Sequence, residues 1–184
     1  APDAVQPIVV EPSPTNRQAS ANGEEPVPFV SDPALLRFAT PEELGLPGRF
    51  ERVKRPDLEP ILSLGLAQSA ARVTYSSPVT NEILFVDVLR LEDGVDAETF
   101  FASFADALVD NASFRGTRTV GVPRGVGELA RHYAFRVEGD QAEAAAVLRG
   151  QIIALVKYRR PADLRVPLDV GALLRALDAA LADG

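Results

Sequence analysis

The stretch "AAAVLRGQIIALVKYRR", residues 144–160, decides the fold of this chain. Two apolar runs are separated by Arg149 and Gly150, and a glycine in such a two-residue connection is typical of a β-hairpin turn. Strands that are joined by a tight turn run antiparallel. The sequence therefore predicts strands at 142–148 and 151–159, and a sheet that is built from antiparallel pairs.

Strand patterns recur upstream of this hairpin. In "AARVTYSS", residues 70–77, apolar and polar side chains alternate, which is typical of a half-buried strand. The stretch "EILFVDVLRL", residues 82–91, is apolar on both faces and predicts a central strand that is covered on much of both sides. Less regular patterns predict further strands at 48–53, 117–122 and 128–138.

Two segments have the apolar period of a helix. Residues 96–111, "DAETFFASFADALVDN", repeat phenylalanine, alanine and leucine at helical spacing, and Asp96 is a favourable N-cap. Residues 168–183, "LDVGALLRALDAALAD", place leucines on one stripe, with Asp169 as the N-cap. The shorter pattern "TPEELG", residues 40–45, predicts a short helix.

The apolar face of an amphipathic helix has to be buried, and an antiparallel sheet offers a face that can cover it. The sequence therefore predicts an α+β fold. We expect a two-layer sandwich, with an antiparallel sheet of five to seven strands and the helices at 96–111 and 168–183 packed on it. One core cluster is expected to hold the large apolar side chains of these elements: Phe85, Val86, Phe100, Phe104, Leu108, Ile153, Leu173, Leu174 and Leu177.

The N-terminal segment 1–31 differs from the rest in composition. It contains six prolines and, apart from residues 8–10, no apolar run. Proline lacks a backbone donor, and a segment with so little apolar surface cannot offset its ordering entropy. We expect 1–31 to be an extended linker or tether without a helix or strand longer than four residues. Residues 32–184 are expected to form a single α+β domain.

Composition excludes several classes of function. The chain has no cysteine, which excludes disulfides, thiolate nucleophiles and Cys-ligated metal sites. Its net charge of −7 argues against a nucleic-acid partner, because nucleic-acid binding needs a basic surface. No run of about 18 apolar residues occurs, so we expect no membrane-spanning segment. We also expect no cofactor and no metal.

The chain contains no methionine and begins Ala1-Pro2-Asp3, so we expect it to be a processed product. A polar, Pro- and Ser-rich segment after such a start is typical of the mature N-terminus of an exported bacterial protein. In a lipoprotein, a lipidated cysteine would precede Ala1 and anchor the protein in the membrane. We therefore expect a membrane-anchored protein in the periplasm or at the cell surface, with an untargeted disordered tail as the alternative.

His132 is the only histidine of the chain, so it is the only imidazole that could act as a general base. In the predicted strand 128–138 it shares a face with Ala134 and Arg136, which offer no acceptor, while Tyr133 points to the other face. General-base catalysis needs an orienting group and a substrate site. We therefore expect a neutral, partly exposed ring that has no catalytic role and binds no metal.

The remaining candidate residues are expected to serve the fold. Asp87 lies on a mostly apolar face of its strand, so we expect an arginine partner or a place at the edge of a pocket. The glycines of "GVPRGVG", residues 121–127, match no phosphate-binding loop and predict a flexible connection. "KYRRP", residues 157–161, predicts the basic end of a strand. Asn111–Ser113 matches a glycosylation sequon.

The chain resembles a group of known domains in the stretches "NEILFVDVLRLEDGVDAETFFASF" and "GELARHYAFRVEGDQAEAAAVLRGQIIALVKY", the latter followed by "DVGALLRALDAAL". The pattern is similar to that of small secreted or lipoprotein domains of high-GC bacteria. Their architecture is similar to the PsbP and Mog1 class of sandwiches. The resemblance covers about residues 70–183 and rests on strand order and apolar pattern. It implies a domain without catalysis and carries over no functional residue.

These observations favour a binding role. We expect an exported, membrane-tethered, non-enzymatic accessory subunit or protein-binding module, whose partner is another protein or a membrane protein complex. Contact with the membrane is expected only through an N-terminal lipid anchor. An apolar pocket between the helix at 96–111 and the sheet would instead make the chain a small-ligand or lipid-binding module. A hydrolase that uses His132 with an Asp or Glu is the third alternative.

Overall fold

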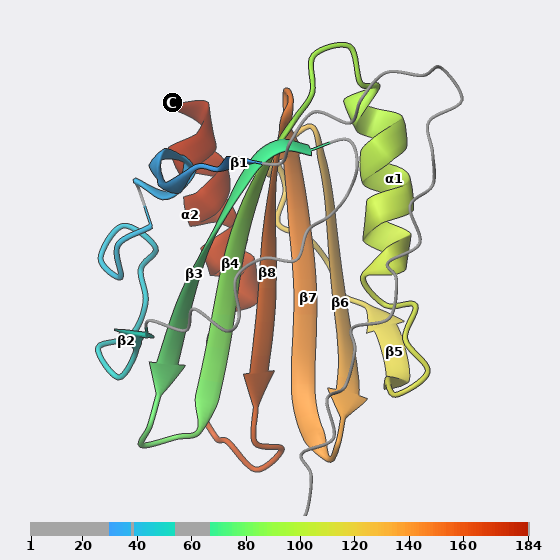
Figure 1. Ribbon diagram of the computed structural model, residues 1–184. Coiled ribbons are helices and arrows are strands. Elements are labelled where there is room, and N and C mark those ends of the chain that lie inside the picture. The colour runs from blue at the N-terminus through green and yellow to red at the C-terminus, as the bar shows by residue number, and fades with distance from the viewer. Residues whose placement is uncertain (1–29, 38, 54–66, 184) are drawn as a thin grey trace, which may run out of the picture.

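A computed structural model describes residues 30–37, 39–53 and 67–183 of the chain. In this part of the chain, eight strands form one sheet in the order β1-β3-β4-β8-β7-β6-β5, with β2 also paired to β3 (Figure 1). The strands are β1 (Val30–Ser31), β2 (Glu51–Val53), β3 (Ala67–Ser77), β4 (Glu82–Leu91), β5 (Arg115–Thr119), β6 (Leu129–Val137), β7 (Asp140–Arg149) and β8 (Ile152–Arg160). The helices are η1 (Pro33–Leu36, a 3-10 helix), α1 (Ala97–Ala107) and α2 (Val170–Ala182).

The sheet is antiparallel except at β1, whose two residues pair in parallel with β3. The hairpin predicted from 144–160 is confirmed, because β7 and β8 pair as far as Arg149 and Ile152. Gly150 in its turn has a φ of 57°, a left-handed conformation that favours glycine. The predicted α+β sandwich with two helices on an antiparallel sheet is therefore confirmed.

Both long helices begin at the predicted caps. The Asp96 side chain accepts a hydrogen bond from the Thr99 backbone N–H at 3.1 Å. The Asp169 side chain accepts one from the Ala172 N–H at 2.9 Å. Such bonds satisfy amide groups that have no partner within the helix. α1 ends at Ala107, four residues before the predicted end, because the chain turns at 108–109.

The short helix predicted at 40–45 is instead a hydrogen-bonded turn. Capping bonds do form here, because the Glu43 N–H donates to Thr40 Oγ1 at 3.2 Å and the Thr40 hydroxyl donates to Glu43 Oε2 at 2.8 Å. Gly45 then adopts a left-handed φ of 63°, which ends the turn before a helix can extend.

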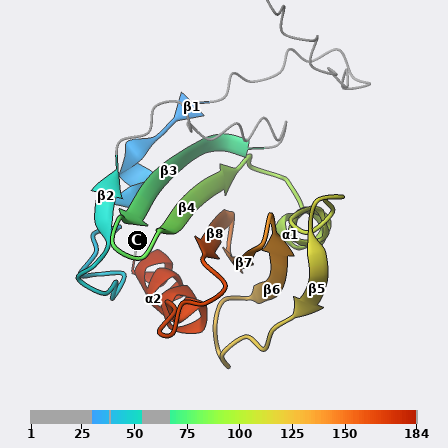
Figure 2. The same ribbon diagram turned by 90° about the horizontal axis from the view of Figure 1, so that it is seen from below.

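The two helices cover opposite faces of the sheet, so the sandwich has three layers and the expectation of two was wrong (Figure 2). On the α2-side face, Leu84 and Val86 of β4 belong to one core cluster with Leu174 of α2. On the α1-side face, Leu89 of β4 belongs to a second cluster with Phe101 of α1. Successive side chains of a strand point to opposite faces, which explains why β4 is apolar on both.

The expected single core is therefore divided. Val86, Leu173, Leu174 and Leu177 lie in the α2-side core, whereas Phe104 and Ile153 lie in the α1-side core. The remaining three predicted core residues, Phe85, Phe100 and Leu108, are only half-buried. Phe100 and Leu108 lie at the margin of the α1 stripe, whose buried residues are Phe101, Phe104 and Ala105.

The segment before β3 completes the α2-side core. Its apolar side chains Leu35, Leu44, Leu46 and Phe50 are buried there. The fully buried Tyr75 of β3 donates a hydrogen bond from its hydroxyl to the Ala39 carbonyl oxygen. Burial raises the pKa of Tyr75 to about 12. Residues 1–29 of the predicted linker lie outside the described residues, while Val30 and Ser31 form β1.

Candidate functional site

Asp87 of β4 is fully buried on the α1-side face and is paired with Arg72 of β3, directly opposite in the register. Arg72 donates two hydrogen bonds to its carboxylate, at 2.5 and 2.8 Å. The Arg72 guanidinium also lies 5.1 Å from the centre of the Phe85 ring. The expected arginine partner of Asp87 is thus confirmed, and a bidentate bond of this kind explains how a carboxylate is tolerated in the core.

His132 has a different environment from the one expected. The residue is only 4% exposed, and its Nε2 lies 2.7 Å from Glu143 Oε2. Glu143 comes from the neighbouring strand β7, opposite Ala134, so it is a diagonal neighbour of His132. The prediction of a partly exposed ring without an acceptor was therefore wrong. The His132 Nδ1 atom is buried and has no hydrogen-bond partner among the described residues.

The C-terminal end of the glycine-rich connection at 121–127 packs against the sheet. Val126 is buried, and Gly127 has a φ of 60°. A Cβ at Gly127 would lie 2.3 Å from Val147 Cγ2 and 2.8 Å from the Leu148 carbonyl oxygen. The predicted connection exists. Gly127 is required by the close approach of its backbone to β7, and not by a need for flexibility.

Two other predicted features also serve local structure. The Asn111 side chain accepts hydrogen bonds from the Ser113 backbone N–H at 2.9 Å and from its hydroxyl at 2.6 Å. Residues 157–161 include the end of β8, as predicted. In this stretch Arg159 binds Asp140 at 2.7 Å and Glu138 at 3.1 Å, so its charge is neutralised at the β6–β7 turn.

A buried carboxylate that the sequence reasoning missed organises one end of the molecule. Glu82, the first residue of β4, has a fully buried side chain. Arg49 donates to it at 2.6 and 3.0 Å, and the Thr80 hydroxyl donates at 2.5 Å. The Tyr158 hydroxyl also donates to Glu82 and accepts from the Leu168 N–H at 3.0 Å.

The charged state of Glu82 is favoured by these bonds. Burial opposes ionisation, but the hydrogen bonds from Arg49, Thr80 and Tyr158 outweigh it and lower the pKa of Glu82. Burial, with the bond to Glu82, raises the pKa of the Tyr158 hydroxyl. Glu82 is therefore a carboxylate and Tyr158 a neutral donor at neutral pH, and the network is fully satisfied.

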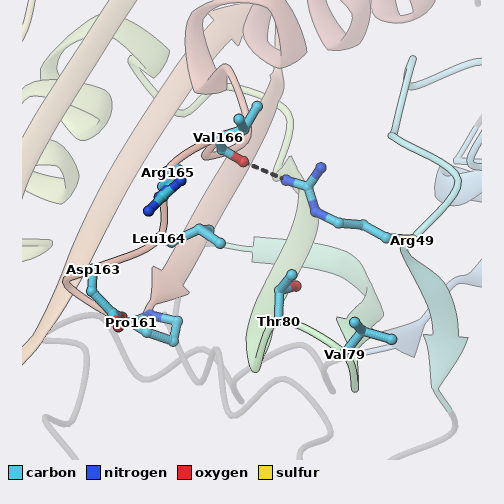
Figure 3. A pocket seen from close by; sticks show the side chains of 8 residues that line it. All are labelled: Arg49, Val79, Thr80, Pro161, Asp163, Leu164, Arg165 and Val166. Carbon is cyan, nitrogen blue, oxygen red and sulfur yellow. Dashed lines mark hydrogen bonds between the residues drawn. The ribbon is translucent and has the colours of Figure 1, made fainter.

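A groove opens beside this network, between the β3–β4 turn and the loop that follows β8 (Figure 3). It has a volume of about 420 Å³. Arg49 borders it and donates to the Val166 carbonyl oxygen at 3.0 Å, across its upper end in the figure. We name this feature the Val79–Val166 groove, and its lining residues are Arg49, Val79, Thr80, Pro161, Asp163, Leu164, Arg165 and Val166.

A second groove, of about 760 Å³, lies between η1, α2 and the ends of β4 and β8. Apolar side chains such as Leu35 and Ile152 line it together with charged ones such as Arg37, Arg90 and Asp183. Neither groove borders the helix at 96–111, next to which the sequence predicted an apolar pocket. The inward face of α1 is filled instead by Phe101, which is fully buried.

Sequence reasoning missed the Glu82 network because its members are far apart in the chain. One signal was present in the sequence: Glu82 opens a strand that is apolar on both faces, so a charge at that position needed a partner. Within the described residues, no three His, Asp or Glu side chains come together as a metal site. The helices in the same part of the chain are too short or too polar to cross a membrane.

Comparison with known proteins finds likeness at the level of structure. No protein-family model and no curated protein matches the sequence. The fold is similar to that in the crystal structure of the extracellular domain of PknH from Mycobacterium tuberculosis, with a TM-score of 0.51 and 13% sequence identity. The match covers 78% of this chain and 90% of that chain. The two chains therefore share a fold.

Proposed function

We propose that this chain is an exported, membrane-tethered, non-enzymatic protein-binding module, and that the Val79–Val166 groove is its docking surface. One observation carries the proposal. Among the described residues, the exposed large aliphatic side chains are Val79, 87% exposed, and Val166, 70% exposed. These two side chains come from segments far apart in the chain, yet both line this groove. Exposed apolar side chains that gather at one place mark interaction sites.

The groove is preorganised. Arg49 holds Glu82 and the Val166 carbonyl oxygen together, and Tyr158 links Glu82 to the Leu168 N–H. Both walls are therefore fixed by the same buried carboxylate. A surface that is rigid before binding loses less conformational entropy when its partner docks.

Charge identifies the occupant. Arg165 is exposed at the groove and forms no ion pair with a described residue, although the Asp163 carboxylate also lines the groove. A partner protein that inserts an apolar side chain between Val79 and Val166, with a carboxylate beside it, would complement both features of the surface. Arginine next to apolar contact area is a common composition for the centre of a protein interface.

Two observations support an extracytoplasmic location. The chain carries a Pro-rich N-terminal segment, which is typical of a tether. The similar solved structure is that of an extracellular domain. The lipid anchor and the finer likeness to the PsbP and Mog1 class stay predictions.

The proposal of a non-enzymatic role rests on where the ionisable groups lie. Glu82, Asp87 and Asp178 are buried, and arginines hold all three. His132 and Glu143 bind one another and border neither groove. Catalytic groups need access to a substrate site, and the carboxylates of this set other than Glu143 are buried, as is His132.

Site-specific photocrosslinking in cells that make the protein naturally tests the proposal. A photoreactive amino acid is placed at position 79 or 166 and, as a control, at the exposed position 98 on α1. We expect positions 79 and 166 to crosslink to the same protein and position 98 not to do so. The product at position 79 should be lost in Val166→Ser and Arg165→Gln variants. The absence of a product, or the same products at all three positions, contradicts the proposal.

The second groove supports a second candidate function, the binding of a small amphipathic ligand. Its volume of about 760 Å³ lies in the usual range of ligand sites, and its lining combines apolar with charged side chains. Titration with a fluorescent fatty acid tests this function. An Ala180→Trp variant, which fills the groove, should abolish saturable binding. Binding that the variant leaves unchanged excludes this site.

A further inference from the structure

The registers place a row of polar residues across four strands, where β6 and β8 end and β7 begins, which is the lower end of the sheet in Figure 1. The registers place Arg115 opposite Arg136, Arg136 opposite Gln141, and Gln141 opposite Arg160. Residues that pair across neighbouring strands point to the same face. Arg160 is two residues from Tyr158 of the α2-side core, so the row lies on the α2-side face. We name Arg115, Arg136 and Arg160, with Arg118 one pair further along β5, the arginine row.

The arginine row has no carboxylate partner among the described residues, although Arg115 Nη1 donates to the carbonyl oxygens of Ala112 and Phe114. Arg115, Arg118 and Arg136 are exposed, and none of the four forms an ion pair with a residue that the structure describes. The Nε of Arg160 is buried without a hydrogen-bond partner in the same part of the chain. Other arginines of the described residues do bind carboxylates, namely Arg49, Arg72, Arg149 and Arg159.

The nearby carboxylates are already engaged. Glu143 lies on the same face as the row, but its Oε2 is 2.7 Å from His132 Nε2. Glu138 and Asp140 of the β6–β7 turn bind Arg159, which lies on the opposite face. The four arginines of the row outnumber the Glu143 carboxylate on this face, so the row keeps a local positive charge in a chain whose net charge is −7.

The arrangement costs stability without a bound anion. Like charges directly opposite each other in antiparallel strands repel, and Arg115 faces Arg136 in this way. Charges on an edge strand protect it from pairing with other chains, which accounts for arginines on β5. That explanation does not extend to Arg136 and Arg160, which belong to the inner strands β6 and β8.

We propose that the arginine row binds a compact ligand with two linked phosphate groups. Guanidinium groups match phosphate oxygens with paired N–H donors. Neighbouring strands lie about 4.8 Å apart. The strands of Arg115 and Arg136 are direct neighbours, and the strand of Arg160 lies two strands beyond that of Arg136. This spread suits adjacent phosphates, with the Gln141 amide as an additional donor between them. Ala134, opposite Arg118, leaves room on the face.

The charge of the whole chain favours a compact ligand over an extended one. At physiological salt, a charge is screened beyond about 8 Å, so the row attracts an anion that sits directly on it. A bilayer of anionic lipid or a nucleic acid would also meet the rest of a chain with a net charge of −7. This site is separate from the Val79–Val166 groove and does not depend on the proposed function.

Calorimetric titration of the full chain with inorganic pyrophosphate, in about 0.15 M NaCl, tests the proposal. We expect saturable binding that weakens about tenfold or more in Arg136→Gln and in Arg160→Gln, because each loses charged hydrogen bonds. Arg136→Lys keeps the charge but loses the paired donors, so it should weaken binding less than Arg136→Gln. Arg175→Gln, on the exposed side of α2, is the matched control and should bind as the wild type does. Circular dichroism establishes that each variant is folded.

Vesicle sedimentation distinguishes the source of the diphosphate. Vesicles that carry an isoprenoid diphosphate should sediment the protein, in competition with pyrophosphate, if the natural ligand is a lipid headgroup. Pyrophosphate binding without such sedimentation assigns a free diphosphate. No saturable binding of pyrophosphate, equal binding by the Arg136→Gln and Arg160→Gln variants, or sedimentation only by phosphatidylglycerol vesicles overturns the proposal.

Discussion

Arg49 donates two hydrogen bonds to the buried carboxylate of Glu82, at 2.6 and 3.0 Å, from a position 33 residues earlier in the chain. Tyr158 of β8 donates to the same carboxylate. Three segments that lie far apart in the chain therefore meet at one side chain. The stability of this end, and the shape of the Val79–Val166 groove, depend on it.

Glu82→Gln should lower the free energy of unfolding by about 2–4 kcal/mol. The amide keeps the size of the side chain but loses the charge that Arg49 and Tyr158 bind. The Arg49 side chain is 24% exposed, so water compensates part of the loss. Urea denaturation measures the change. Glu51→Gln, on the exposed strand β2, is the control and should change stability by less than about 0.5 kcal/mol. Equal effects of the two changes would contradict the role of Glu82.

Stability should fall in acid. Hydrogen bonds from Arg149 lower the pKa of Asp178 against the opposing effect of burial, and the Glu82 pKa is also lowered. A carboxyl group with a lowered pKa in the folded state stabilises the fold above its ordinary pKa, and this contribution is lost as the pH falls through the folded-state value. Urea midpoints between pH 7 and pH 3 should therefore decrease mainly below about pH 4. A Glu82→Gln/Asp178→Asn variant should show a flatter profile, and an unchanged slope would count against both groups.

Leu177→Ala should destabilise the protein by about 2–5 kcal/mol. Leu177 of α2 is fully buried in the α2-side core, so the truncation leaves a cavity. Leu181→Ala on the same helix removes a half-buried side chain and should cost clearly less. Thermal unfolding that ranks Leu181→Ala at or above Leu177→Ala would mean that α2 docks in another way.

Gly127→Ala should cost about 2–5 kcal/mol, because a left-handed φ and two short contacts act together. Gly125 also has a positive φ, of 76°, but a Cβ there meets open space. Gly125→Ala should therefore cost only about 1–2 kcal/mol. The difference between the two variants in urea denaturation isolates the close approach to Val147, and similar costs would assign the whole effect to backbone strain.

Features that depend on near neighbours could be predicted from the sequence. The caps at Asp96 and Asp169 and the turn at Gly150 need only a few adjacent residues, and all three were predicted. The number of layers could not be obtained in this way, because an apolar stripe on a helix does not say which face of the sheet it covers. The sequence of β4 did indicate the number of layers, because a strand that is apolar on both faces needs to be covered on both.

The candidate sites depend on register, which the sequence leaves open. The partner of His132 is Glu143, and their contact requires the pairing of Ala134 with Glu143 across β6 and β7. The pairing of Arg115 with Arg136 in the register also depends on an irregularity in β5 that shifts the register between Arg115 and Arg118. A shift by one residue would place these side chains on opposite faces.

The central position of β4 has a consequence for how the chain folds. β4 ends at Leu91, but its neighbour β8 begins only at Ile152. During synthesis, the edge of β4 that pairs with β8 therefore stays unpaired until about 60 further residues have been made, and loop closure over such distances slows folding. An unpaired apolar edge is prone to aggregation, so the protein should depend on chaperones until β8 arrives, and fragments that stop before β8 should not fold.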